Sequence, residues 1–374
     1  MYDSKMKLEK SISNLKAMNI FNRVSYKMSD GSEPGLKMVD ITIEEKPTGE
    51  ITAGAGYGTE GGAFGFSVKE NNYLGKGLKV SANADITAQS VRGGVNIVNP
   101  NYNYSGNKVY GGFYSKKTDK PSSGFENKIA NVNFGTEFEQ YRDIYLAPDL
   151  SFTIDDLTVD STASSQLKKQ AGTFQDITFS YAIKTDKRNR RYMPTEGHIF
   201  RFKQSLPIYA DSKSITNSFK YSAYHGFSEN LVGAFKLYGA AVNGLGGQDV
   251  RLSKRLHLGR TLLRGFESGK VGPKDGLDYV GGNYVSAMNF EVGLPNLLPE
   301  NTETDISLFL DVANVWHVDY SSSLNDSDKI RSSIGIASNV YTPIGPLSFV
   351  IAQNLSKADT DETQSFNFQI GTSF

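Results

Sequence analysis

Few residues in this chain have the types and spacings that catalysis or metal binding requires. The sequence contains no cysteine, which excludes disulfides, thiol chemistry and cysteine-based metal sites. Its histidines do not stand at metal-ligand spacing, and no nucleophile lies in a pattern that suggests an adjacent base. We therefore expect neither an enzyme nor a metal centre, and interpret four residues as ordinary loop or rim residues: His198, His225, His257 and His317.

A glycine-rich stretch, GAGYGTEGGAFG, formally contains the dinucleotide-binding pattern Gly56-x-Gly58-x-x-Gly61. That pattern needs a helix directly after it, because the helix N-terminus receives the pyrophosphate. Here Phe64 and Phe66 continue an alternation of apolar and small residues instead. The stretch therefore predicts a hairpin of glycine-rich strands, and no nucleotide or other cofactor is expected.

One arginine stands out because it lies in an irregular segment, LHLGRTLLRGFESGKVGPKDG, between regular ones. Long irregular loops are uncommon unless they have a function. Two carboxylates, Glu291 and Asp311, fall on the polar faces of two later, neighbouring segments. The planar fork of Arg264 suits two such carboxylates better than a lysine would, so we predict that the loop folds back and pairs with them. The alternative is that both carboxylates are simply solvated.

The segments around these residues alternate with a period of two from Glu50 onward. In YVSAMNFEVGL the apolar side chains are Met288, Phe290, Val292 and Leu294. Segments of about 9–12 residues with one apolar and one polar or small-residue face are typical of a transmembrane β-barrel. Sixteen such segments are predicted, beginning near residues 50, 62, 77, 91, 107, 127, 143, 174, 197, 214, 231, 283, 304, 330, 346 and 365.

This count gives an all-β transmembrane barrel of sixteen antiparallel strands, in which short turns alternate with longer connections. The longest connection, residues 243–282, carries Arg264 and falls on the outer side. A soluble β-sandwich or propeller also alternates, but its dry core would not tolerate one face rich in Asn, Ser, Thr, Asp and Gly. No blade-length repeat is visible.

Composition and hydropathy bear on nucleic-acid binding, membrane helices and signal peptides. Lys and Arg equal Asp and Glu at 40 each, so the net charge of zero gives no electrostatic footprint for nucleic acid. No run approaches the roughly 18 apolar residues of a membrane helix. The start, MYDSKMKLEK, has no apolar core of a signal peptide.

The first 46 residues differ from the rest. Leu8, Ile12 and Leu15 share one helical face, and the helix is expected to end near Met18. Two strands, RVSYKM and MVDITIEE, follow around the turn SDGSEPG, and Pro47 begins the barrel region. The predicted division is therefore residues 1–46, a small α+β piece, and residues 47–374, the barrel.

Several stretches together resemble the BamA family of outer-membrane β-barrel assembly insertases. LLRGF resembles that family's (V/I)RG(F/Y) loop motif, with Leu263 in place of the usual Val or Ile. Matching stretches occur in the family's order: EKPTGEITAGAGYGTEGG, VNPNYNYSG, DKRNRRYMPTEG, GGNYVSAMNFEVGLP, FLDVANVW, SSIGIASNVYTPIGPLSF and the terminal Phe374. The N-terminal piece resembles the later part of the last POTRA domain, with its opening strand and first helix missing, so Met1 is not expected to be the native start.

The resemblance implies that the loop is a plug whose motif comprises Leu263, Arg264, Gly265 and Phe266. Arg264 is expected to contact Glu291 on the twelfth strand and Asp311 on the thirteenth. The first and last strands, which close the barrel, contain glycines that weaken strand pairing, so a lateral seam is predicted at Gly54, Gly56, Gly58, Gly371 and Phe374. The alternative is that these glycines only provide curvature.

The implied function is the folding and insertion of β-barrel proteins into the outer membrane of a Gram-negative-type bacterium. Its implied partners are unfolded barrel clients, periplasmic accessory lipoproteins, chaperones and the lipid bilayer, with the N-terminal piece in the periplasm. Phe374 resembles the C-terminal signal of such clients, or is an interfacial aromatic. The alternatives are a polypeptide-secreting transporter of the two-partner type and a passive porin.

Overall fold

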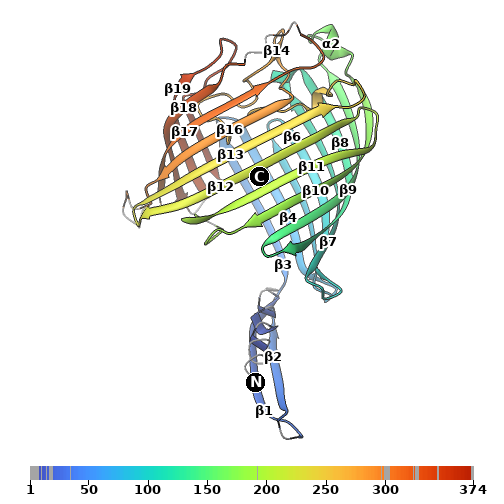
Figure 1. Ribbon diagram of the computed structural model, residues 1–374, viewed down its shortest axis with the longest axis vertical. Coiled ribbons are helices and arrows are strands. Elements are labelled where there is room, and N and C mark those ends of the chain that lie inside the picture. Colours follow the sequence, from blue (N-terminus) through green and yellow to red (C-terminus); the bar gives the residue numbers. More distant parts are fainter. Residues whose placement is uncertain are drawn as a thin grey trace.

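The computed structural model describes residues 8–9, 11–13, 15–16, 20–33, 35–191, 193–295, 297–298, 304–322, 324, 328–342 and 345–371. Its main body is a closed barrel of sixteen antiparallel strands, each paired with the next along the chain and the last paired with the first (Figure 1). The strands are β3 (Gly49–Gly58), β4 (Gly61–Tyr73), β5 (Leu78–Thr87), β6 (Ser90–Tyr102), β7 (Asn107–Lys120), β8 (Phe125–Tyr141), β9 (Ile144–Val159), β10 (Gly172–Asp186), β11 (Glu196–Ala210), β12 (Ser214–Ser228), β13 (Leu231–Gly244), β16 (Tyr284–Gly293), β17 (Thr304–Trp316), β18 (Arg331–Thr342), β19 (Gly345–Ser356) and β20 (Phe366–Gly371).

The predicted fold class is confirmed, and the period-two pattern locates every barrel strand. Each predicted start lies within two residues of the observed one; the largest differences are 127 against 125 and 174 against 172. The agreement is close because a half-buried strand needs the alternation along its whole length, whereas the polar turns break it.

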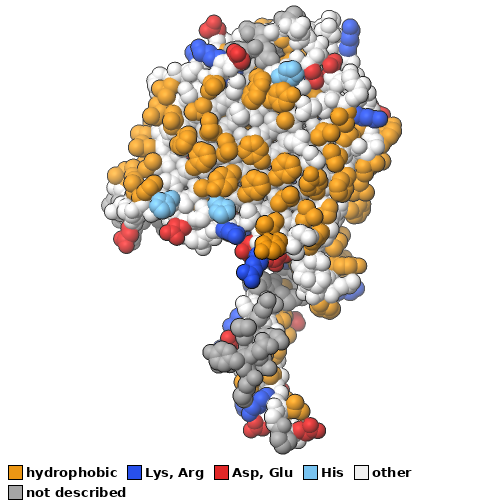
Figure 2. Space-filling view, viewed as in Figure 1, with side chains coloured by type: hydrophobic (Ala, Val, Ile, Leu, Met, Phe, Trp, Pro, Cys, Tyr) orange, Lys and Arg blue, Asp and Glu red, His pale blue; other side chains and the backbone are white. Residues whose placement is uncertain are grey.

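The outer wall of the barrel is apolar. Met288, Phe290 and Val292 of β16 are 40%, 45% and 38% exposed, whereas Asn289 between them is 3% exposed and faces inward. Figure 2 shows hydrophobic side chains gathered across the barrel wall, with charged residues mainly near its two ends. This is the arrangement of a wall that faces hydrocarbon.

The inner face is less uniformly polar than the sequence predicts. Val285 and Ala287 of β16, with Ala313 and Val315 of β17, line the lumen as part of a buried apolar cluster. The connection between β13 and β16 packs against them from inside. Apolar residues are tolerated on this inner face because the loop, rather than water, covers them.

The connection between β13 and β16 lies at what we call the outer end of the barrel. It contains the short 3₁₀ helix η2 (Leu252–Lys254) and a hairpin of two-residue strands, β14 (Lys274–Asp275) and β15 (Asp278–Tyr279). Two further short elements lie at this end: η1 (Pro121–Ser123) and α2 (Ser165–Lys168).

A small separate sheet precedes the barrel and lies beyond its other end (Figure 1). Its strands are β1 (Phe21–Asp30) and β2 (Lys37–Glu45), which pair antiparallel as the sequence predicts. Residues 8–9, 11–13 and 15–16 are helical, and the predicted helix end near Met18 lies outside the described residues. The identification of this piece as part of a POTRA domain stays a prediction. Among the described residues, no helix is long and apolar enough to cross a membrane.

Candidate functional site

The plug loop, residues 245–283 between β13 and β16, turns into the lumen. Leu258, Leu263 and Phe266 are each 2% exposed and form the apolar cluster with the inner faces of β16 and β17. The segment has no helix or strand period because it follows the shape of the lumen. Burial of the three side chains stabilises the seated loop by roughly 1.5–3 kcal/mol each.

Arg264 holds the centre of this loop to the barrel wall. Its Nε and Nη2 donate to Oδ2 and Oδ1 of Asp311 at 2.7 and 2.6 Å, a bidentate pair. Its Nη1 lies 2.8 Å from Oε1 of Glu291, and its guanidinium carbon lies 3.7 Å from the ring centre of Phe309. The structure thus brings Arg264 of the loop together with the two carboxylates that strand parity placed on the inner side of the wall.

Asp311 accepts two further hydrogen bonds, from the backbone N–H of Arg264 at 3.0 Å and from Nδ2 of Asn289 at 2.8 Å. It is fully buried, so its charge depends on these four donors. Glu291 has a second partner, Lys236 on β13, at 2.6 Å. Sequence reasoning missed Lys236 and Asn289, although both stand on the inward-facing parity of their strands.

The structure also explains why the motif residue after Arg264 is a glycine and how the backbone of the motif is held. Gly265 has φ of +84°, and a Cβ there would lie 2.9 Å from the Cβ of Ala352, so a side chain would be strained and crowded. The Gly265 carbonyl accepts a hydrogen bond from Nδ2 of Asn354 at 2.8 Å, and the Arg264 carbonyl accepts one from Oγ of Ser333 at 2.6 Å. The loop is therefore fixed to β18 and β19 as well as to β16 and β17.

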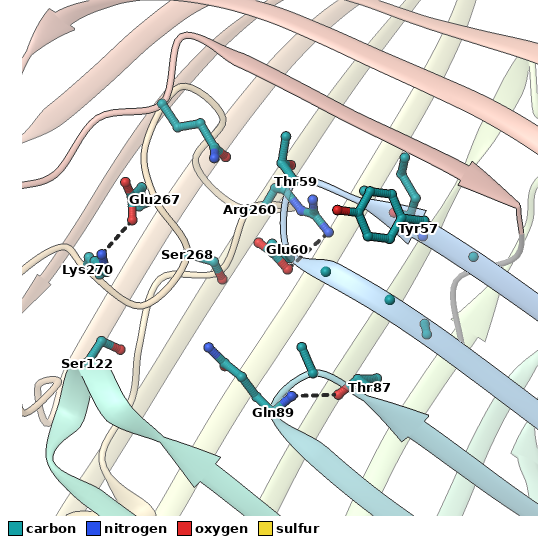
Figure 3. A pocket seen from close by; sticks show the side chains of 18 of the residues that line it. Tyr57, Thr59, Glu60, Thr87, Gln89, Ser122, Arg260, Glu267, Ser268 and Lys270 are labelled. Carbon is teal, nitrogen blue, oxygen red and sulfur yellow. Dashed lines mark hydrogen bonds and ion pairs between the residues drawn. The ribbon is translucent and has the colours of Figure 1, made fainter.

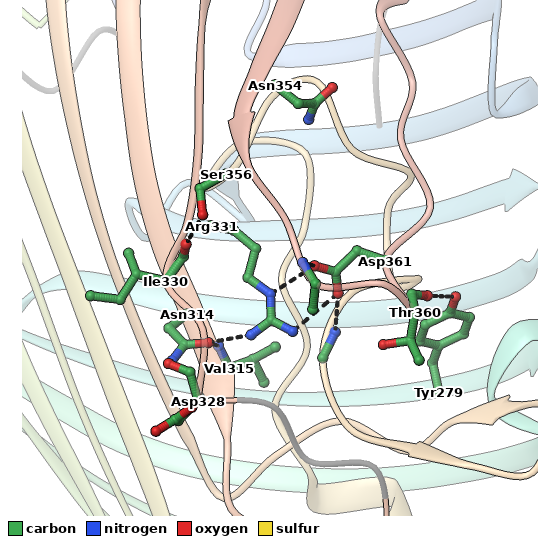
Figure 4. Close-up of polar contacts among 12 residues, drawn as sticks. Tyr279, Asn314, Val315, Asp328, Ile330, Arg331, Asn354, Ser356, Thr360 and Asp361 are labelled. Carbon is green, nitrogen blue, oxygen red and sulfur yellow. Dashed lines mark hydrogen bonds and ion pairs between the residues drawn. The ribbon is translucent and has the colours of Figure 1, made fainter.

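Three more arginines fix the outer end of the loop and its surroundings. Arg251 pairs with Asp176 at 2.8 Å, and Arg255 pairs with Asp319. Arg331 of β18 donates to both oxygens of Asp361 at 2.9 and 3.1 Å (Figure 4). These pairs were not predicted, because the partners are far apart in sequence and no periodicity relates them.

The Arg331–Asp361 pair also contacts the plug loop. Asp361 lies in the connection between β19 and β20, and it accepts a hydrogen bond from the backbone N–H of Gly272 at 3.2 Å. Both side chains of the pair are completely buried. Such a pair adds little net stability but penalises any arrangement in which only one member stays buried.

The plug loop is directly hydrogen-bonded to the segment that leads into β20. The backbone N–H of Glu267 donates to the carbonyl of Glu362 at 3.0 Å, and that of Gln364 donates to the carbonyl of Gly265 at 3.0 Å. Phe266 and Thr363 form an antiparallel bridge between these bonds. The loop therefore acts as a short neighbouring strand to the approach of the last barrel strand.

The contact between β20 and β3 closes the barrel. Among the described residues it has three register pairs, Gln369 with Gly58, Ile370 with Tyr57, and Gly371 with Gly56. Between β3 and β4, register pairs run without interruption from Gly49–Glu70 to Gly58–Gly61. We call the contact between β20 and β3 the seam.

Two of the four described seam glycines are needed for the close approach of the strands. A Cβ on Gly58 would lie 2.5 Å from the carbonyl oxygen of Phe368. Gly371 has φ of +84°, and a Cβ there would lie 2.2 Å from the carbonyl oxygen of Ala55. Gly54 pairs with Gly65 of β4, and the described register pairs of the seam do not reach it. Phe374 lies outside the described residues.

A hollow of about 700 Å³ lies between the seam and the plug loop. Its lining includes the turn between β3 and β4 and the loop residues Arg260, Glu267 and Lys270, as Figure 3 shows. Among the described residues, no group of three or more histidine, aspartate or glutamate side chains is placed to hold a metal ion.

Among known protein families, the sequence model of the Omp85 superfamily domain matches residues 72–374 of this chain. The chain belongs to the Omp85 superfamily. The resemblance to the BamA family, predicted from the motif stretches, is confirmed, and so is an outer-membrane location.

Two relatives and a solved structure match nearly the whole of this chain. The outer membrane protein assembly factor BamA of Neorickettsia risticii is 25% identical over 351 residues, which cover 90% of this chain and 46% of that protein. BamA of Nitratidesulfovibrio vulgaris is 24% identical over 393 residues, covering 98% of this chain and 47% of the relative. The chain thus spans about half the length of these relatives. The crystal structure of Haemophilus ducreyi BamA lacking POTRA domains 1–3 superimposes with a TM-score of 0.85 at 23% identity, over 98% of this chain and 78% of that one.

Proposed function

We propose that this protein is an outer-membrane assembly factor that folds β-barrel clients and inserts them through the seam between β3 and β20. Membership of the Omp85 superfamily and the relatives named as assembly factors support the general activity. The single observation that carries the mechanism is that, among the described residues, β20 and β3 share three register pairs, against ten between β3 and β4.

The seam offers what a client strand needs. Residues 49–52 of β3 lie beyond the register pairs with β20, and a client strand could pair with their backbone groups. A client strand that added to this edge would satisfy its own N–H and C=O groups before it entered hydrocarbon, where each unpaired group costs several kcal/mol. Lateral separation of β20 would extend the same edge.

In this mechanism the plug loop controls the lumen and the seam. Leu263, Gly265 and Phe266 shape the loop, and Arg264 is its latch through Asp311 and Glu291. The backbone bonds between the loop and the approach to β20 would transmit movement of the loop to the seam.

The N-terminal sheet is proposed to be the end of a POTRA domain in the periplasm. Its place beyond the barrel end opposite the plug loop supports this orientation (Figure 1). We propose that periplasmic chaperones and accessory lipoproteins deliver clients on this side. Phe374 is proposed to be this chain's own C-terminal client signal.

The test uses an engineered disulfide across the seam. The chain has no cysteine of its own, so no other disulfide can form within it. Tyr57→Cys and Ile370→Cys replace a register pair of the seam. Thr52→Cys and Ser67→Cys replace a register pair of β3 and β4 and serve as the matched control. Each protein is reconstituted in liposomes, and the folding of a urea-unfolded small barrel protein is followed by its heat-modifiable mobility.

We expect the wild-type protein to accelerate folding relative to empty liposomes. Oxidation should abolish acceleration in the seam variant, reduction should restore it, and the control pair should be insensitive to both. Full activity of the oxidised seam variant would exclude separation of β3 from β20. No acceleration together with steady ion conductance of the wild type would favour a secretion pore or a porin instead.

A further inference from the structure

Three parts of the barrel meet at the side chain of Arg260, four residues before the latch arginine. Its Nη2 lies 3.2 Å from Oε2 of Glu60, in the turn that joins β3 to β4 (Figure 3). Its Nη1 donates to Oδ1 of Asn367, on β20, at 3.0 Å. A single guanidinium on the plug loop therefore contacts both sides of the seam.

Asn367 and Thr59, next to Arg260, also form direct contacts across the seam. Nδ2 of Asn367 donates to the hydroxyl oxygen of Thr59 and to Oε1 of Gln364, the latter at 3.1 Å. The backbone N–H of Thr59 donates to the carbonyl of Phe368 at 3.1 Å. These contacts lie just outside the outermost register pair, Gln369 with Gly58, and extend the seam toward the outer end of the barrel.

We infer that Arg260 is a positioning residue that clasps the outer end of the seam and makes its closure depend on the seated plug loop. The inference rests on the proposed lateral opening and adds its regulation. Arginine suits the position because its planar fork presents donors to two acceptors on different strands. A lysine would offer one ammonium to both acceptors.

The geometry separates this clasp from the latch. Arg264 joins the loop to β16 and β17, whereas Arg260 joins the loop to the turn after β3 and to β20. Loss of the latch should move the loop and withdraw Arg260, so it should loosen both the loop and the seam. Loss of Arg260 should loosen the seam and leave the loop seated, because Asp311 keeps its bidentate partner.

Hydrogen–deuterium exchange of the protein in liposomes tests this difference without any client. The readouts are peptides covering residues 56–60 and 366–371 for the seam, and residues 262–266 for the loop. The variants are Arg260→Ala, Arg260→Lys, Glu60→Gln and Arg264→Ala. The matched control is Arg188→Ala, which removes an arginine paired with Asp186 at 2.7 Å near the opposite end of the barrel.

Arg260→Ala should raise exchange in the seam peptides by about threefold to tenfold, the range for one partly exposed ion pair and one hydrogen bond. Exchange in the loop peptide should stay at the wild-type level. Glu60→Gln and Arg260→Lys should give smaller increases, and Arg264→Ala should raise exchange in both regions.

Seam exchange in Arg260→Ala that equals the Arg188→Ala control would overturn the clasp. Equal increases in the seam and loop peptides of Arg260→Ala would also overturn it, because Arg260 would then only stabilise the loop. Failure of the proposed function is a separate result: it would appear as no acceleration of client folding by the wild type, whatever the exchange pattern.

Discussion

Replacement of Arg264 by alanine is the most direct perturbation of the plug. The change removes the bidentate bond to Asp311, at 2.7 and 2.6 Å, and the contact with Glu291 at 2.8 Å. Glu291 keeps Lys236 as a partner, so its charge stays compensated. Asp311 is 0% exposed, and among the described residues Arg264 is its only ion-pair partner, so most of the cost falls there.

The magnitude follows from what remains around Asp311. Removing one member of a buried ion pair costs about 3–5 kcal/mol. The backbone N–H of residue 264 and Nδ2 of Asn289 still donate to the carboxylate, at 3.0 and 2.8 Å, so we expect the lower end of that range. About 3 kcal/mol corresponds to a rise of roughly 100-fold in the open population of the loop.

Limited chymotrypsin digestion measures this population, because Phe266 is 2% exposed in the seated loop and becomes cleavable when the loop opens. When opening is fast relative to cleavage, the cleavage rate follows the open population. The barrel itself should stay heat-modifiable, since no barrel register pair includes residue 264.

A double-mutant cycle sharpens the test. Asp311→Ala together with Arg264→Ala removes both charges, so the double variant should open far less than the two single effects predict; we expect a coupling of about 2–3 kcal/mol. Cleavage of Arg264→Ala at the wild-type rate would refute the latch. Additive single effects would refute the argument that the unpaired Asp311 charge is the cost.

Two further predictions concern pH and the seam. Burial first, and nearby cations second, lower the pKa of His257 to about 3, so the folded loop holds it neutral while the unfolded chain protonates near pH 6.5. Stability should therefore fall as the pH drops below about 6.5, by roughly 2 kcal/mol at pH 5, and thermal unfolding of His257→Gln should lose this part of the pH dependence. Gly371→Ala would place a Cβ 2.2 Å from the carbonyl oxygen of Ala55, so it should slow oxidation of the seam cysteine pair several-fold; Gly62→Ala, whose Cβ would have no atom nearer than 4.0 Å, is the control. Unchanged oxidation in Gly371→Ala would contradict the close packing at the seam.

The sequence by itself determined the number, order and facing of the barrel strands. Alternation is a local property: a strand with one face to lipid and one to the lumen must repeat every two residues, whatever its neighbours are. For this reason the inward parity of Glu291 and Asp311 could be predicted before their partner was located. The irregular composition around Arg264 likewise indicated a long loop, and the family resemblance predicted its role as a plug.

Only the tertiary structure decided which side chains meet in the lumen and which residues pair across the seam. The loop has no period, so its path depends on complementarity with several strands at once, and Arg255 with Asp319 or Arg331 with Asp361 could not be paired from spacing. The seam depends on how far β20 extends along β3, which is a property of barrel closure and not of either strand alone. Arg260 shows the same limit: nothing in the spacing of the loop sequence relates it to Glu60 or Asn367, and these two partners come together only when the barrel closes.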